Sequence, residues 1–213
     1  MRHDLPPAPP GLTIGLFGGS FDPVHHGHLR LSMTALRRLG LDRLWWLVSP
    51  GNPLKRHGPA PLAQRIAGAR ARISDPRIHV TGVEQTLGTR QTASTLAALQ
   101  RLYPRNRFVW IMGADNLAGL HNWAEWHRIM ERVPVAVLAR PGQRLAALCS
   151  KAAQRYRARR LPAHRALELA RHPAPAWCFL NMPMSAESSS RLRCCDAAPH
   201  DGASRHLRSG SGA

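Results

Sequence analysis

The chain of 213 residues contains no apolar run close to the roughly eighteen residues that a membrane-spanning helix needs. Its first ten residues are rich in proline and lack the apolar core of a secretory signal. Both absences argue against an integral membrane protein and against secretion. We therefore expect a cytoplasmic protein with no membrane partner.

Cysteine is scarce as well, and the sequence holds only Cys149, Cys178, Cys194 and Cys195. No Cys-x-x-Cys pair is present, and two adjacent cysteines rarely form a relaxed disulfide with each other. The sequence therefore predicts reduced thiols.

Acidic residues are few, with 12 Asp and Glu against 30 Lys and Arg, which gives a formal net charge of +18. A basic surface attracts polyanions such as nucleic acids or phosphorylated small molecules. All the basic residues except Lys55 and Lys151 are arginines, however, and they are scattered along the chain in a way typical of a GC-rich genome. We therefore expect no nucleic-acid partner.

The distribution of apolar residues, 44% of the chain, predicts one domain over residues 11–195, between a disordered arm at 1–10 and a disordered tail at 196–213. Short apolar runs predict buried strands at residues 12–17, 43–49, 77–83, 107–113, 134–140 and 176–181. Helical patterns follow at 27–39, 61–74 and 92–103, with Thr92 as a candidate N-cap of the last. Alternating strands and helices predict an α/β fold with a doubly wound, mostly parallel sheet, whose ligands bind beyond the carboxyl ends of the strands.

The stretch GLFGGSFDPVHHGH, residues 15–28, lies between the first strand and the first helix. Gly18 and Gly19 would let backbone N–H groups approach a phosphate at the start of the helix. The spacing fits neither a P-loop nor a G-x-G-x-x-G fingerprint. His25 and His28 are three residues apart, so both imidazoles would lie on one side of the first helical turn and donate to phosphate oxygens. A metal site formed by these histidines with Asp22, or a merely exposed polar turn, is the alternative.

These motifs carry a family resemblance. GGSFDPVHHGH resembles the GGxFDPxHxGH signature of the HxGH nucleotidyltransferase superfamily, and more narrowly the bacterial nicotinate-nucleotide adenylyltransferases. Further similar segments follow in the family's order: SPGNPLK, TASTL, GADNL with a nearby tryptophan, ARPG and, at residues 188–193, SSSRLR. The resemblance covers residues 12–193 and implies a Rossmann-like nucleotidyltransferase fold.

The resemblance also implies the reaction. Enzymes of this family join ATP to nicotinate mononucleotide in NAD biosynthesis and release deamido-NAD and pyrophosphate. The mononucleotide phosphate attacks the α-phosphorus of ATP in line, so positioning and charge neutralisation replace an enzyme nucleophile. Mg²⁺ would arrive with ATP, and no protein side chain would bind a metal.

By the same resemblance, His28 would stabilise the α-phosphate and His25 would bind the phosphates, whereas His26 fills a variable position. Further ATP contacts would come from Gly18, Gly19, Ser20, Phe21, Asp115, Ser188, Ser189 and Arg193. Mononucleotide contacts would come from Asn52, Lys55, Thr92, Thr95 and Trp123, the last stacking on the pyridine ring. Ordinary roles compete with several of these: helix capping for the threonines and Asp115, core packing for Trp123 and Trp126, and solvation for Lys55 and the serine run.

The sequence departs from the family pattern at its C-terminal end. Ser190 and Leu192 replace the usual threonine and isoleucine, Glu187 brings a negative charge beside the late phosphate motif, and the final helix of the family is missing. Other acceptors, nicotinamide mononucleotide or phosphopantetheine, remain alternatives, as does a basic nucleic-acid-binding protein on a degenerate transferase fold. The sequence leaves a homo-oligomer open.

Overall fold

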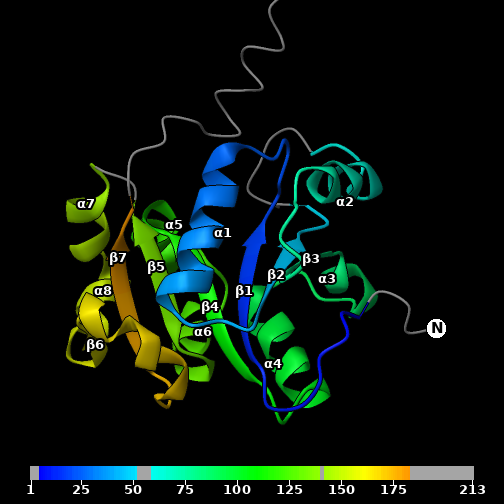
Figure 1. The fold of residues 1–213 in the computed structure, drawn as a ribbon. Helices are drawn as coiled ribbons and strands as arrows, with labels where there is room; N and C mark the ends of the chain where they lie inside the picture. The colour runs from blue at the N-terminus through cyan, green and yellow to red at the C-terminus, as the bar shows by residue number, and fades with distance from the viewer. Residues whose placement is uncertain (1–4, 52–58, 140–141, 183–213) are drawn as a thin grey trace, which may run out of the picture.

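The computed structural model describes residues 5–51, 59–139 and 142–182, which form a parallel sheet flanked by helices (Figure 1). The sheet contains seven strands in the order β3-β2-β1-β4-β5-β7-β6, and every pairing among them is parallel. The strands are β1 Thr13–Gly19, β2 Arg43–Val48, β3 Ile78–Thr81, β4 Arg107–Gly113, β5 Val135–Ala139, β6 Arg160–Leu161 and β7 Trp177–Asn181. The predicted α/β fold with a doubly wound parallel sheet is confirmed.

Helices follow most of these strands. The α-helices are α1 His26–Arg38, α2 Leu62–Ala71, α3 Val83–Thr86, α4 Thr92–Leu102, α5 Ala114–Gly119, α6 Trp126–Arg132, α7 Arg144–Leu148 and α8 Lys151–Arg155. Three 3₁₀ segments complete the described elements: η1 Leu120–Asn122, η2 Arg157–Arg159 and η3 Ala163–Arg171.

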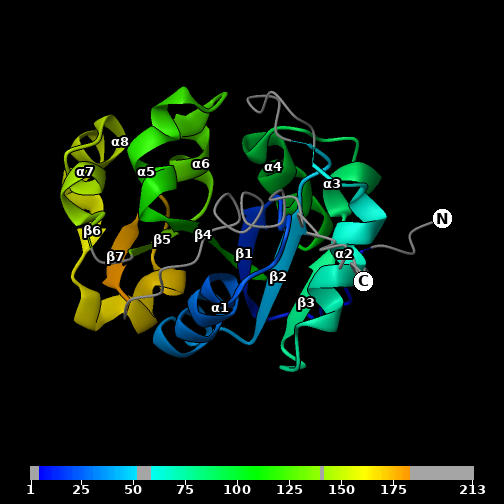
Figure 2. The same ribbon diagram turned by 90° about the horizontal axis from the view of Figure 1, so that it is seen from above.

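Two apolar layers cover the two faces of the sheet. Figure 2 shows α1 on one face and α4, α5 and α6 on the other. Trp45 and Trp46, which are neighbours on β2, are both fully buried. Because side chains alternate along a strand, Trp45 packs into the layer on one face of the sheet and Trp46 into the layer on the other. A strand that is buried on both faces reads as the continuous apolar run RLWWLV.

The order of the strands places a topological switch between β1 and β4. From β1 the chain proceeds outwards to β2 and β3, then crosses back to β4 and proceeds in the opposite direction to β5. In doubly wound sheets such a switch opens a crevice at the carboxyl ends of the strands, where ligands bind. The turn after β1 and the start of α5 directly follow the two strands at this switch.

Residues 5–10, which their proline content predicted to be unfolded, make defined contacts. Pro6 is buried, and the hydroxyl of Tyr103 donates a hydrogen bond of 2.9 Å to its carbonyl oxygen. Leu5 and Ala8 pack against the core on the α4 side of the sheet.

Within the described ranges, Cys149 and Cys178 are free thiols, and burial raises the pKa of Cys178 to about 12. Over the same part of the chain, no helix has the length and apolar character to cross a membrane.

Candidate active site

The turn between β1 and α1 brings His25 and His28 together. His25 is the N-cap residue of α1 in an extended conformation, and the two imidazole rings stack with centroids 3.8 Å apart. The backbone N–H of His25 donates to Nδ1 of His28 at 3.3 Å. Since Nδ1 accepts, the proton of a neutral His28 ring lies on Nε2. The predicted placement of both rings on one side of the first helical turn agrees with this geometry.

A buried network holds the start of α1. The hydroxyl of Ser32 donates to the carbonyl oxygen of His28 at 2.8 Å, and the indole N–H of Trp46 donates to that hydroxyl at 2.8 Å. Ser32 and Trp46 are both fully buried. The network links β2 to the first turn of α1, whereas His26 is exposed and takes no part in it.

Phe21 turns its side chain inwards. Its ring is buried and stacks on Trp46 with centroids 4.6 Å apart and planes 7° apart. Its φ of 48° lies in the left-handed region, which costs a non-glycine residue on the order of 1 kcal/mol. The stacking offsets that cost. The predicted ATP contact of Phe21 is therefore restricted to its backbone.

Packing alone already requires a glycine at position 18. A Cβ atom at this position would lie 2.6 Å from Cη2 of Trp110, far inside contact distance. At Gly19 the nearest atom would be the Phe21 ring at 3.2 Å, a tight but less severe contact. The glycine pair thus lets β1 pass beside two aromatic rings. Phosphate contacts of these backbones, and of Ser20, stay predictions.

Asp115 is the second residue of α5, the helix that follows β4. Its side chain is exposed and bends back over Gly113, where a Cβ atom would collide with the carboxylate. Gly113 is the last residue of β4, which pairs directly with β1. The carboxylate is therefore placed at the carboxyl edge of the sheet, and its contact with ATP stays a prediction.

The two predicted threonines lie at the start of α4. The N-cap is Gln91, so the expectation that Thr92 caps this helix is wrong, and Thr92 is half-buried in the first turn. Thr95 is fully buried, and its hydroxyl donates to Oε1 of Glu84 at 3.2 Å and lies 2.9 Å from that of Thr89. The Thr95 side chain therefore connects the start of α4 to Glu84 and Thr89. Contacts of either threonine with a mononucleotide stay predictions.

Trp123 is half-buried, and so is its neighbour Trp126. Both rings pack against the core on the α4 side, and Trp126 also meets Tyr156 edge to face at 6.2 Å. Core packing and ligand stacking thus remain alternatives for Trp123. The predicted site residues Asn52, Lys55, Ser188, Ser189 and Arg193, together with Glu187, lie outside the described residues.

The sequence reading missed Arg65, a buried arginine on α2 beside the turn after β1. The signal was present: Leu62, Ile66 and Ala69 form an apolar stripe at helical spacing, and Arg65 lies on that stripe. A charged residue on a core-facing stripe indicates a buried polar role.

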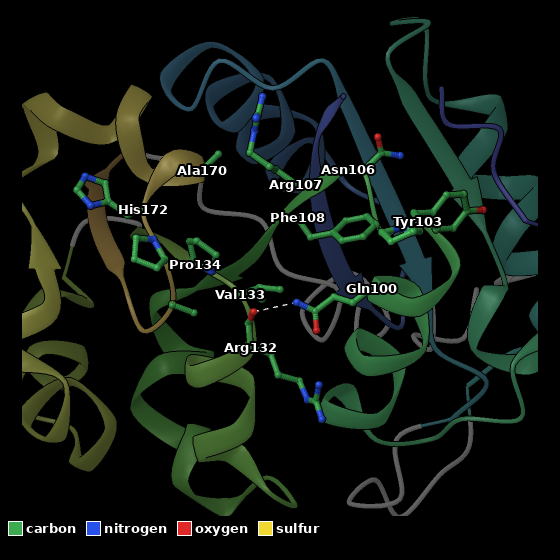
Figure 3. Close-up of a pocket in the computed structure, with 13 residues that line it drawn as sticks. Gln100, Tyr103, Asn106, Arg107, Phe108, Arg132, Val133, Pro134, Ala170 and His172 are labelled. Carbon is green, nitrogen blue, oxygen red and sulfur yellow. Dashed lines mark hydrogen bonds between the residues drawn. The ribbon is translucent and has the colours of Figure 1, made fainter. Parts of the chain in front are cut away.

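Among the residues that the structure describes, no three His, Cys, Asp or Glu side chains gather as a metal site. A hollow of about 270 Å³ lies at the opposite edge of the sheet, lined by residues that precede β4, β5 and β7 (Figure 3). We call it the amino-edge recess, and its lining includes Arg107, Arg132 and His172. The two arginines point away from each other, so they do not converge on one ligand (Figure 3).

Comparison with known proteins assigns the class of the chain. It belongs to the cytidylyltransferase-like family, whose model matches residues 16–194. Within that class, it is 58% identical over 193 residues to a probable nicotinate-nucleotide adenylyltransferase of Ruegeria pomeroyi, covering 91% of each chain. It is 59% identical over 182 residues to a protein of the same name from Cereibacter sphaeroides, covering 85% of this chain and 96% of the relative.

The fold has a solved counterpart as well. The nicotinic acid mononucleotide adenylyltransferase of Plasmodium falciparum complexed with NaAD matches with a TM-score of 0.64 at 16% sequence identity, covering 86% of this chain and 83% of that one. At this identity the likeness shows a shared fold.

Proposed function

We propose that the protein is a nicotinate-nucleotide adenylyltransferase, which transfers the adenylyl group of ATP to nicotinate mononucleotide and releases pyrophosphate. The observation that carries the proposal is the near-full-length identity of 58% to a relative of that name. The paired histidines after β1 support it independently, because they place donors at a helix start beside the switch point of the sheet.

The reaction needs no nucleophile from the protein. A phosphate oxygen of the mononucleotide forms a bond to the α-phosphorus of ATP, and the bond from that phosphorus to the bridging oxygen breaks on the opposite side. The bonding electrons leave with pyrophosphate, and the product is deamido-NAD. Catalysis then consists of alignment and of stabilising the charge on the α-phosphate oxygens.

His28 is suited to that second task. Its Nδ1 accepts from the backbone of His25, which places the proton of a neutral ring on Nε2, the nitrogen that would donate to a phosphate oxygen. The first turn of α1 adds the positive end of the helix dipole. His25, stacked on His28, would bind the phosphates beside it.

Mg²⁺ would accompany ATP and neutralise part of its phosphate charge. In the turn after β1 the histidines offer nitrogen atoms and the Asp22 carboxylate accepts a hydrogen bond from the backbone of Ala60, whereas Mg²⁺ takes oxygen ligands. The metal would therefore be held by the phosphates themselves, as the sequence led us to expect. A cytoplasmic location and the oligomeric state stay open predictions.

A panel of acceptors tests the proposal. Purified protein is incubated with ATP and Mg²⁺ and, in separate reactions, with nicotinate mononucleotide, nicotinamide mononucleotide or phosphopantetheine, and the initial rate of pyrophosphate release is measured. We expect the highest kcat/KM with nicotinate mononucleotide. A preference for phosphopantetheine would overturn the assignment, and tight, strongly salt-dependent RNA binding without any pyrophosphate release would favour the nucleic-acid-binding alternative.

A further inference from the structure

Arg65 is a buried arginine that bonds to the turn after β1. It is 4% exposed, and within the described part of the chain its guanidinium donates to four backbone carbonyl oxygens. The acceptors, with donor-acceptor distances, are Ala60 at 2.6 Å, Ser20 at 2.8 Å, Ser49 at 2.8 Å and Pro50 at 3.4 Å. The planar guanidinium of an arginine presents five N–H donors in a rigid fork, whereas a lysine ammonium has three donors on one nitrogen and cannot span acceptors that lie far apart.

These acceptors belong to three separate stretches of chain. Ser20 lies in the turn after β1, Ser49 and Pro50 directly follow β2, and Ala60 precedes α2. One side chain therefore joins the turn after β1 to both ends of the connection between β2 and α2, at the carboxyl edge of the sheet.

Asp22 completes the arrangement from the turn itself. Its Oδ2 accepts from the backbone N–H of Ala60 at 3.2 Å, while Arg65 donates to the carbonyl oxygen of the same residue. The backbone N–H of Ala60 is thus bonded to Asp22 of the turn, and its carbonyl oxygen to Arg65, which also bonds the turn at Ser20. This gives the Asp of the FDP motif a role in shaping the turn, in place of the metal alternative.

Burying a guanidinium is costly, and burial lowers the pKa of Arg65 while the nearby Asp22 carboxylate raises it. An apolar side chain on this stripe of α2 would avoid the cost, and such replacements often leave stability unchanged or improve it. An arginine at this position is therefore better explained by the loop carbonyl groups that it holds in place than by a gain in stability.

We propose that Arg65 is a positioning residue of the transfer site, which fixes the turn from Ser20 to Asp22 against the end of β2. Through this turn it sets where the backbone N–H groups and His28 meet the triphosphate. The effect on turnover rests on the proposed function, because it is measured with nicotinate mononucleotide as the acceptor. The proposal also predicts that variants of Arg65 bind ATP more weakly, and this can be measured without an acceptor.

The test compares Arg65→Lys and Arg65→Met with Arg70→Lys and Arg70→Met. Arg70 lies on the same helix, is exposed and makes a single bond of 3.2 Å to the carbonyl of Val80, so it is a matched control. All assays are run at a temperature at which circular dichroism shows each variant fully folded. Steady-state kinetics give kcat and KM for ATP, and calorimetry gives the affinity for a non-hydrolysable ATP analogue.

We expect Arg65→Lys to lower kcat/KM for ATP by at least about tenfold and to weaken binding of the analogue, with a larger loss in Arg65→Met. The Arg70 variants should stay within about twofold of wild type. A folded Arg65→Lys protein with wild-type kcat, KM and analogue affinity would overturn the proposal, even if Arg65→Met failed to fold. If wild type showed no transfer to nicotinate mononucleotide, the proposed function would fail, and analogue binding would still decide the role of Arg65.

Discussion

The two edges of the same sheet differ in how their polar groups are arranged. At the amino edge, Arg107 and Arg132 line a recess of about 270 Å³ but point apart (Figure 3). At the carboxyl edge, His25 and His28 stack, and Arg65 and Asp22 hold the turn beside them. In a parallel sheet the carboxyl edge also collects the helix N-termini that follow the strands. The comparison teaches that organised donors, rather than a hollow in the surface, distinguish the candidate functional site.

Removing one hydrogen-bond donor from each edge should have very different effects on turnover. We expect His28→Ala to lower kcat for pyrophosphate release by about 10²- to 10³-fold, because one preorganised donor to the transition state is lost. Arg107→Ala, in the amino-edge recess, should leave kcat within about twofold of wild type, as should His26→Ala at the exposed neighbour. Near-normal turnover by His28→Ala, or a large loss in Arg107→Ala, would reverse the assignment of the two edges.

A smaller effect, on stability, tests the packing of the turn. Gly18→Ala would place a Cβ atom 2.6 Å from the ring of Trp110, and we expect a loss of about 1–3 kcal/mol in the free energy of unfolding. Gly68→Ala on α2 meets no atom within 4 Å, so it should instead stabilise by roughly 0.5–1 kcal/mol through helix propensity. Urea unfolding of both variants gives the two values.

A second substitution checks the cause assigned to Gly18. Trp110→Phe removes the outer ring that carries the clashing atom, so Gly18→Ala should cost less in that background than in wild type. Equal costs in the two backgrounds would show that Trp110 is not the obstacle.

The smallest effect concerns Glu84, whose pKa is raised by burial and lowered to a lesser extent by the Thr95 hydroxyl. A raised pKa in the folded state favours the protonated form, so this contribution to stability is full below the unfolded pKa of about 4.3 and is lost as the pH rises through the folded value. Glu84→Gln mimics the protonated form and keeps the acceptor for Thr95.

We therefore expect the Tm of Glu84→Gln, relative to wild type, to increase between pH 4 and pH 8 by roughly 2 °C or more. Glu125→Gln, at an exposed carboxylate, controls for the loss of one negative charge and should show a smaller change. A difference for Glu84→Gln that stays constant across this range would contradict the raised pKa.

Much of the fold followed from local pattern. The apolar runs predicted β1, β2, β4, β5 and β7 because a strand buried on both faces has a nearly continuous apolar sequence. The sequence did not predict the two-residue β6 or the short helices α3, α5, α6, α7 and α8, since elements of two to seven residues are too short to show a period.

The site was only partly predictable for a different reason. Sequence spacing placed His25 and His28 together because both lie within one helical turn. It could not show that Phe21 turns inwards onto Trp46, or that Thr95 is bonded to Glu84, because these contacts join segments distant in sequence. The role of Arg65 is likewise defined by carbonyl groups from the turn after β1 and from both ends of the β2–α2 connection, which no local motif contains.

The central claim is adenylyl transfer at the carboxyl edge, and tracing the phosphates of ATP tests it most directly. The protein is incubated with nicotinate mononucleotide, Mg²⁺ and ATP labelled at either the α- or the γ-phosphorus, and the products are separated. We predict that the α label appears in a dinucleotide and the γ label in pyrophosphate, in equal amounts. A γ label on the mononucleotide, or no dinucleotide at all, would contradict the account.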